Sequence, residues 1–130
     1  MSTEFWALVA AIVIGFVHII LQATSSTMVR STEWNVGPRD ESKPPLSGMP
    51  GRFERALRNF LETFPFFAAA ILMAQATRVH NDLTVWGAWL YVAARVLYIP
   101  LYAYGVSYVR SLAWAAGTLG IALVLFGLPS

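Results

Sequence analysis

Four long apolar runs dominate the pattern of hydrophobic and polar positions along the chain, at about residues 5–23, 60–76, 83–104 and 112–128. A helix of about 20 residues crosses the roughly 30 Å hydrocarbon core of a bilayer, and about 17 residues is the lower end. The runs are continuous rather than alternating, which excludes transmembrane strands. Lipid also requires each backbone amide to be bonded within its own segment. The pattern therefore predicts an all-α integral membrane protein, a bundle of four transmembrane helices in one domain of residues 1–130.

Composition supports this interpretation and removes several function classes. Hydrophobic residues make up 57% of the chain and charged residues only 12%, against about 25% charged in soluble domains. No basic run alternates with aromatic residues, so nucleic acid is not an expected partner, whereas the lipid bilayer is. The chain contains no cysteine, so any thiol chemistry must use a thiol from another molecule.

A long loop is expected between the first two spans, over about residues 25–51, because this segment is dense in turn formers. These are Gly37, Pro38, Pro44, Pro45, Gly48, Pro50 and Gly51. Loops of this length are usually functional or disordered. A shorter loop is expected over residues 105–110. The first four residues hold no cation, so the first run is predicted to be a retained span and not a signal peptide.

Charge asymmetry predicts the orientation. Seven cations fall on the side of the first and third loops, and the other side holds only Arg78; the seven are Arg30, Arg39, Lys43, Arg52, Arg55, Arg58 and Arg110. Cytoplasmic segments of membrane proteins carry the excess of Lys and Arg. The seven-cation side is therefore predicted to be cytoplasmic, with both termini outside. Trp114 falls near a span end, which is typical of an interfacial anchor.

Polar residues gather where the second and third helices approach the cytoplasmic side. Helical spacing places Arg52, Arg55, Asn59 and Glu62 on one face, with Arg58 beside them. In the third helix the same spacing gives one face to Arg95, Tyr98 and Tyr102, while Arg110 and Ser111 open the fourth helix. Charges inside a span are costly and need a partner or a function. We predict a cationic pocket between the helices at this end.

Two interpretations of this pocket stay open. Glu62 could pair with Arg58 or Arg95 and simply hold the bundle together. The cations outnumber the carboxylate, however, and arginine suits forked recognition of carboxylates, which favours an anionic ligand that bears carboxylates. His18 and Gln22 are four residues apart in the first span. We interpret His18 as an interhelical contact and predict no metal, since metal sites need three or four clustered ligands.

The segment RALRNFLETFP at residues 55–65 resembles the second-helix signature of the MAPEG family, the membrane-associated proteins in eicosanoid and glutathione metabolism. The segment ARVLYIPLY at residues 94–102, followed by YVRS at 108–111, is similar to the third helix of that family and the start of its fourth. The resemblance covers nearly the whole chain. The stretch 37–41 looks more like prokaryotic members, which implies a bacterial inner membrane.

The resemblance implies a homotrimer with glutathione bound between neighbouring subunits at the cytoplasmic side. Carried over by position, the glutathione-binding residues would be Arg55, Arg58, Asn59, Glu62, Arg95, Tyr98 and Tyr102. Arg110 and Ser111 match the residues proposed to stabilise the thiolate. A guanidinium in a poorly hydrated site lowers the pKa of a thiol, which is ordinarily near 8.5. The second substrate would be a lipophilic small molecule that arrives through lipid.

Three hypotheses for the function follow. The first is a glutathione transferase or glutathione-dependent peroxidase that acts on lipophilic electrophiles or hydroperoxides, with Arg110 as the thiolate stabiliser. The second is a non-catalytic scaffold protein that binds glutathione or lipid. The third is a small transporter subunit, which the lack of charged residues inside the first and fourth spans disfavours. Whether the protein is an enzyme stays open at this point.

Overall fold

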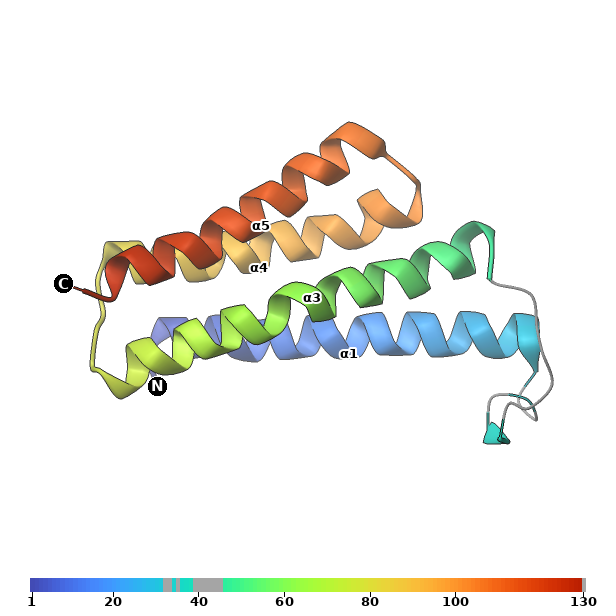
Figure 1. Cartoon of the computed structure of the whole chain (residues 1–130), viewed down its shortest axis with the longest axis horizontal. Coiled ribbons are helices and arrows are strands. Elements are labelled where there is room, and N and C mark those ends of the chain that lie inside the picture. The colour runs from blue at the N-terminus through green and yellow to red at the C-terminus, as the bar shows by residue number, and fades with distance from the viewer. Residues whose placement is uncertain (32–33, 35, 39–45, 130) are drawn as a thin grey trace.

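Four helices make up the fold in the computed structural model, which describes residues 1–31, 34, 36–38 and 46–129. They are α1 (Thr3–Arg30), α3 (Gly48–Ala76), α4 (Asp82–Ala103) and α5 (Ser107–Gly127), labelled as in Figure 1. By length and composition, each of the four could cross a membrane. The predicted all-α bundle of four membrane-spanning helices is confirmed.

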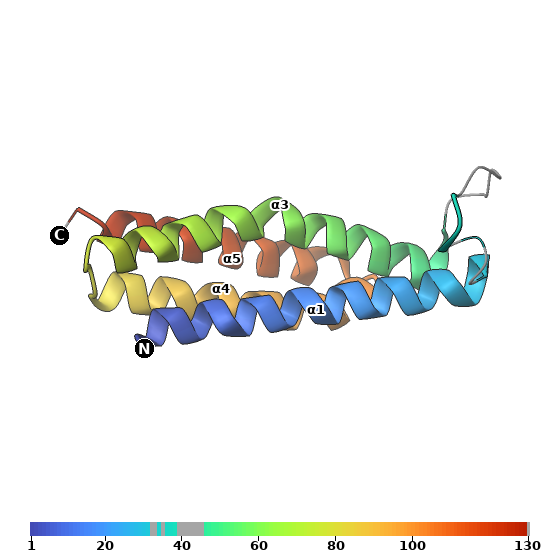
Figure 2. The ribbon, with the colours of Figure 1, turned by 90° about the horizontal axis from the view of Figure 1, so that it is seen from below.

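The helices run up and down, so both termini lie at one end of the bundle (Figures 1 and 2). We call this the terminal end. At the opposite end α1 finishes, α3 starts, α4 finishes and α5 starts. We call that the arginine-rich end, after Arg30, Arg52, Arg55, Arg58 and Arg110. Both α3 and α4 contact all three other helices, so these two form the centre of the bundle.

The structure corrects the predicted loop of residues 25–51 at both ends. Helix α1 continues to Arg30, because residues 24–30 contain no Gly or Pro to stop it. Helix α3 already begins at Gly48, which places Pro50 in its first turn. The first N–H groups of a helix have no intrahelical partner, so proline is tolerated there. Ten residues of this loop lie outside the described part of the chain, namely residues 32, 33, 35 and 39–45, which include Arg39, Lys43, Pro44 and Pro45.

The connection between α4 and α5 is also shorter than the predicted loop of residues 105–110, since α5 begins at Ser107. Gly105 makes the tight turn possible with a φ of 71°, a left-handed conformation that glycine adopts without steric cost. Arg110 and Ser111 therefore lie inside the helix, within its first two turns.

Small and aromatic side chains fill the core, and large apolar ones cover the outside. Ala7, Ala11, Ala70 and Ala88 are buried. The outer surface carries many exposed aliphatic and aromatic side chains, for example Phe126, which is 73% exposed. Apolar patches of this extent mark a surface that is covered by something other than water, and lipid around four membrane-spanning helices is the covering that this fold requires.

Helices α4 and α5 approach each other backbone to backbone. A Cβ atom built on Gly120 would lie 2.6 Å from the carbonyl oxygen of Gly87, and one built on Gly87 would lie 2.5 Å from that of Gly120. Close approach at small residues is a common way to pack helices in membranes, where no hydrophobic effect drives them together. This pair of helices accordingly has the most extensive interhelical contact in the bundle.

A polar cluster ties α1 to α4 at the terminal end. Glu4 is only 3% exposed, and its Oε2 atom accepts a hydrogen bond of 2.8 Å from the hydroxyl of Thr84. His80 Nδ1 lies 2.8 Å from the same carboxylate oxygen. Asn81 caps α4 through Thr84 and donates from Nδ2 to the carbonyl of Gly127 at 3.0 Å. The cluster thus links α1, α4 and α5, and neither Glu4 nor His80 had a role in the sequence analysis.

Alanine substitutions at two glycines of α5 test the backbone contact. Gly120→Ala forces its Cβ onto backbone atoms, which cannot turn away, so we expect a lower thermal midpoint in detergent, with a cost of about 1–3 kcal/mol. Gly117→Ala, one turn earlier, meets its nearest atom at an ordinary 3.5 Å and is the matched control. It should be neutral or stabilising, because alanine is favoured over glycine in helices by about 1 kcal/mol. Equal midpoints for both variants would contradict the close approach.

Substitution of Glu4 tests the cluster at the terminal end. Glu4→Ala removes the buried carboxylate that accepts the hydrogen bond of Thr84 and contacts His80, and we expect the free energy of unfolding to fall by about 1–3 kcal/mol. His80→Ala is the comparison, because the histidine side chain is 62% exposed and exposed ion pairs contribute about 0–1 kcal/mol. Denaturant unfolding in detergent micelles measures both. A larger loss for His80→Ala than for Glu4→Ala would refute this ranking.

Candidate functional site

The polar face predicted for the start of α3 points at α4. Arg52 donates from Nη1 to the carbonyl oxygen of Ala103 at 3.1 Å. One turn further, Arg55 donates from Nε to the hydroxyl of Tyr102 at 3.3 Å. Another turn deeper, the Oδ1 atom of Asn59 accepts a 2.8 Å hydrogen bond from Arg95 Nη1. The α3 residues spaced three and four apart in the sequence thus form a row of hydrogen bonds to α4. We call this row the seam.

Two guanidinium groups flank a pair of tyrosine rings on the facing side of α4. The Cζ atom of Arg95 lies 4.2 Å from the centroid of the Tyr98 ring, and the rings of Tyr98 and Tyr102 are 5.4 Å apart. Arg110 of α5 lies over the other ring, with its Cζ atom 4.9 Å from the centroid of Tyr102. Such contacts stabilise cations in places that water reaches poorly. The stack connects the interior of the bundle to the start of α5.

A pocket of about 300 Å³ opens between α3, α4 and α5 at the arginine-rich end. Six residues line it, namely Asn59, Tyr98, Tyr102, Arg110, Ser111 and Trp114. Five of them are among the nine site residues that the sequence predicts. Arg55 and Arg95 do not line the pocket, but each is hydrogen-bonded to a residue that does. Among these described lining residues none is acidic and one is a cation, so the pocket is suited to an anion.

A family comparison bears directly on this arrangement. The sequence model of the MAPEG family matches residues 6–128. The chain belongs to the MAPEG family. Membership supports, in general terms, a membrane glutathione-related transferase or peroxidase, or a related role, and proteins of the family generally use glutathione. A search of curated proteins finds no match.

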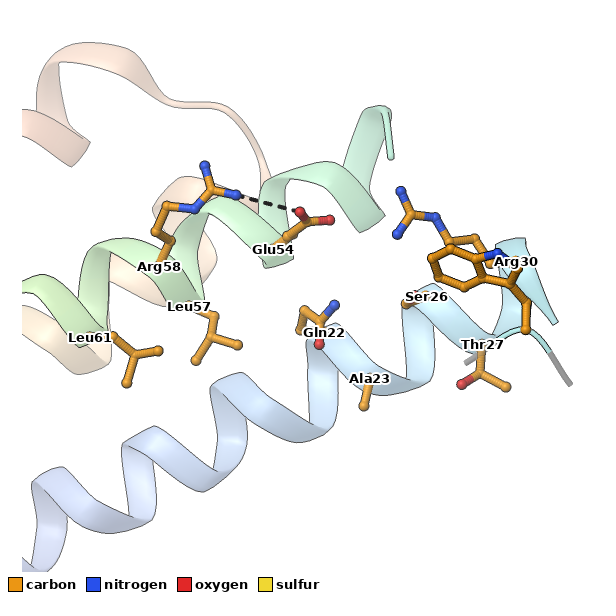
Figure 3. Close-up of a pocket in the computed structure, with 10 residues that line it drawn as sticks. Gln22, Ala23, Ser26, Thr27, Arg30, Glu54, Leu57, Arg58 and Leu61 are labelled. Carbon is orange, nitrogen blue, oxygen red and sulfur yellow. Dashed lines mark ion pairs between the residues drawn. The ribbon is translucent and has the colours of Figure 1, made fainter. Parts of the chain in front are cut away.

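Arg58 of this MAPEG chain does not line the pocket between α3, α4 and α5. Its Nη2 atom lies 3.5 Å from the carboxylate of Glu54, one turn earlier. Both residues line a second pocket, of about 440 Å³, which Figure 3 shows between the end of α1 and the start of α3. The leucines Leu57 and Leu61 point from α3 toward α1 beneath that ion pair (Figure 3).

Glu62 is exposed and lines neither of these two pockets. In the described part of the chain, Arg58 pairs with Glu54 and Arg95 bonds Asn59. Neither arginine forms the ion pair with Glu62 that was the structural alternative in the sequence analysis. The reason is geometric, because the guanidinium of Arg58 extends toward Glu54, one turn before it, and Arg95 meets α3 one turn before Glu62.

Trp114 is the lining residue that the sequence analysis interpreted differently. Position near a span end suggested an interfacial anchor, but the indole forms part of the pocket wall. The spacing carried a usable signal, since Trp114 follows Arg110 and Ser111 by four and three residues and so shares their helix face. His18 is buried, as an interhelical contact requires, and its ring packs on Phe60 at a centroid distance of 5.2 Å.

Proposed function

We propose that this MAPEG protein is a membrane glutathione transferase or glutathione-dependent peroxidase that acts on lipophilic electrophiles or hydroperoxides. One observation carries the proposal, namely the pocket that gathers Asn59, Tyr98, Tyr102, Arg110 and Ser111 from three helices. Glutathione bears two carboxylates and one ammonium group, so it is an anion overall at neutral pH. A pocket with a lining guanidinium and neutral hydrogen-bonding groups suits such a ligand.

The proposed glutathione contacts follow from this geometry. Asn59, Tyr98 and Tyr102 would bind the peptide directly. Arg55 would act indirectly, through the hydrogen bond that it donates to the hydroxyl of Tyr102. Arg58 and Glu62 stay within the proposal as contacts from the exposed side of α3. In a homotrimer with glutathione between subunits at the cytoplasmic side, these exposed groups would face a neighbouring copy. A bacterial inner membrane with both termini outside is part of the same proposal.

Arg110 and Ser111 would act on the sulfur. Both line the pocket, and a guanidinium close to a thiol favours its ionised form. The thiolate then attacks the electrophilic carbon of the second substrate, a C–S bond forms and the leaving group departs. With a hydroperoxide, the sulfur attacks the terminal oxygen, the O–O bond breaks, and the alkoxide takes up a proton and leaves as the alcohol. The sulfenic acid of glutathione that remains reacts with a second glutathione to give glutathione disulfide and water. Each unit by which the pKa of the thiol falls is worth about 1.4 kcal/mol.

Trp114 is the proposed wall for the second substrate. Its side chain lines the pocket beside Arg110 and is 43% exposed, so an apolar molecule that diffuses in lipid could reach it. Binding next to the sulfur would supply much of the rate acceleration by positioning.

Glutathione should raise the thermal midpoint of the detergent-purified protein, because a ligand of the native state stabilises it by mass action. At a concentration of about 100 Kd the gain is about 2.7 kcal/mol. Asn59→Ala should lose about half of the shift, since a Kd that is about tenfold higher lowers the gain to about 1.4 kcal/mol. Asn81→Ala makes the same chemical change at the terminal end and should keep it, although its starting midpoint will be lower. A wild-type protein that shows no shift at millimolar glutathione would refute the binding proposal.

Arg110→Ala should separate chemistry from binding. We expect conjugation of an aromatic halide to fall at least about tenfold, which corresponds to one pKa unit of the thiol, while glutathione still gives a calorimetric signal. Arg78→Ala, at the terminal end, is the matched control and should leave turnover unchanged.

The same assay sorts the competing hypotheses. Unchanged activity in Arg110→Ala would remove this residue from the mechanism. Binding without turnover in the wild type would instead identify a scaffold protein, and flux into liposomes without conjugation would identify a transporter.

A further inference from the structure

Arg95 is a cation buried inside a membrane-spanning helix. It is 1% exposed, and its hydrogen bond of 2.8 Å goes to a neutral carboxamide, the Oδ1 atom of Asn59. In the described part of the chain its Nε and Nη2 atoms have no hydrogen-bond partner. Buried cations are usually paired with carboxylates, and one that is not is expensive to keep. Its retention calls for a function other than a salt bridge.

Packing fixes the guanidinium in one place. The ring of Tyr98 lies 4.2 Å from the Cζ atom of Arg95, and the ring of Phe60 lies 5.4 Å from it. On the other side α5 comes close at Gly117, where an added Cβ would lie 3.8 Å from Cδ of Arg95. The side chain is thus held between three helices and has little freedom to move toward a ligand.

The hydrogen bond determines which half of the Asn59 carboxamide faces the pocket. A guanidinium has only donors and a carboxamide has one acceptor oxygen and one NH₂ group, so Arg95 must take the oxygen. Asn59 lines the pocket and Arg95 does not. The NH₂ group is therefore the half that is left for a ligand, and this position offers two donors and no acceptor.

We propose that Arg95 is a positioning residue that acts through Asn59. It holds the carboxamide with its NH₂ group toward the pocket, so that this subsite selects an acceptor, either a carboxylate or a peptide carbonyl oxygen. Without Arg95 the carboxamide rotates freely and presents donor and acceptor equally. The proposal rests on the proposed function for the identity of the ligand, glutathione, but not for the role of the hydrogen bond itself.

Glutathione affinity in a double-mutant cycle tests the proposal. Arg95→Met and Asn59→Ala should each raise the Kd for glutathione about tenfold, as expected for the loss of a well-placed hydrogen bond to a charged group. The double variant should bind no more weakly than Asn59→Ala alone, because Arg95 acts only through Asn59. Arg95→Lys should recover part of the affinity, since an ammonium also donates. Arg78→Met, at the terminal end, is the control and should bind as the wild type does.

Asn59→Asp provides an independent readout that a merely structural bond would not give. The carboxylate strengthens the contact with Arg95, so the thermal midpoint without ligand should stay the same or rise. The same change replaces the NH₂ group by an acceptor, so the Kd for glutathione should rise more than about tenfold. The variant is therefore expected to keep its thermal midpoint while its affinity for glutathione falls. Wild-type affinity in Asn59→Asp, or fully additive effects in the cycle, would overturn the proposal.

The experiment distinguishes failure of the proposed function from failure of the positioning role of Arg95. If the wild type does not bind glutathione, the cycle is read from the thermal midpoints without ligand, and Arg95→Met and Asn59→Ala should still be non-additive there. Additive midpoints would overturn the coupling whatever the ligand. Binding by the wild type together with additive losses of affinity would leave the proposed function intact and remove only the positioning role of Arg95.

Discussion

The hydrogen bond between Arg95 and Asn59 is the interaction on which the arginine-rich end depends. A guanidinium at this depth finds hydrogen-bond partners only within the bundle, and here it is bonded to the carboxamide of Asn59. The bond turns the polar face of α3 toward α4, and Arg52 and Arg55 follow at one-turn intervals. It also sets the start of the stack of rings and cations that leads outward to Arg110. The pocket lies along this stack.

The two ends of the bundle satisfy their polar groups in different ways. At the terminal end Glu4 is matched by Thr84 and His80, and the cap residue Asn81 is matched by a carbonyl of α5. These contacts hold the helices together at that end. At the arginine-rich end the lining residues of the pocket include a guanidinium without a lining carboxylate. A surplus of one charge is what a binding site for the opposite charge requires.

Much of the fold and part of the site follow from the sequence for identifiable reasons. Four apolar runs suffice to predict four helices, since lipid leaves a long apolar segment no other structure. Periodicity also predicts that Asn59 lies on the polar face of α3 and that Tyr98 and Tyr102 share one face of α4. It does not say which helix each face meets. Arg58 therefore proved to be paired with Glu54 of its own helix and not to line the pocket. Glu4 was missed because it precedes the apolar run, and its burial depends on Thr84, which is 80 residues away in the chain.

The backbone contact of Gly87 with Gly120 has a mechanical consequence for the pocket. Because no side chain separates α4 from α5 there, the two helices are joined closely at the terminal end. Five of the six lining residues belong to this pair of helices, namely Tyr98, Tyr102, Arg110, Ser111 and Trp114. Asn59 alone among the lining residues belongs to α3. We expect any widening of the entrance for a bulky substrate to occur at the seam between α3 and α4, which three arginine side chains bridge.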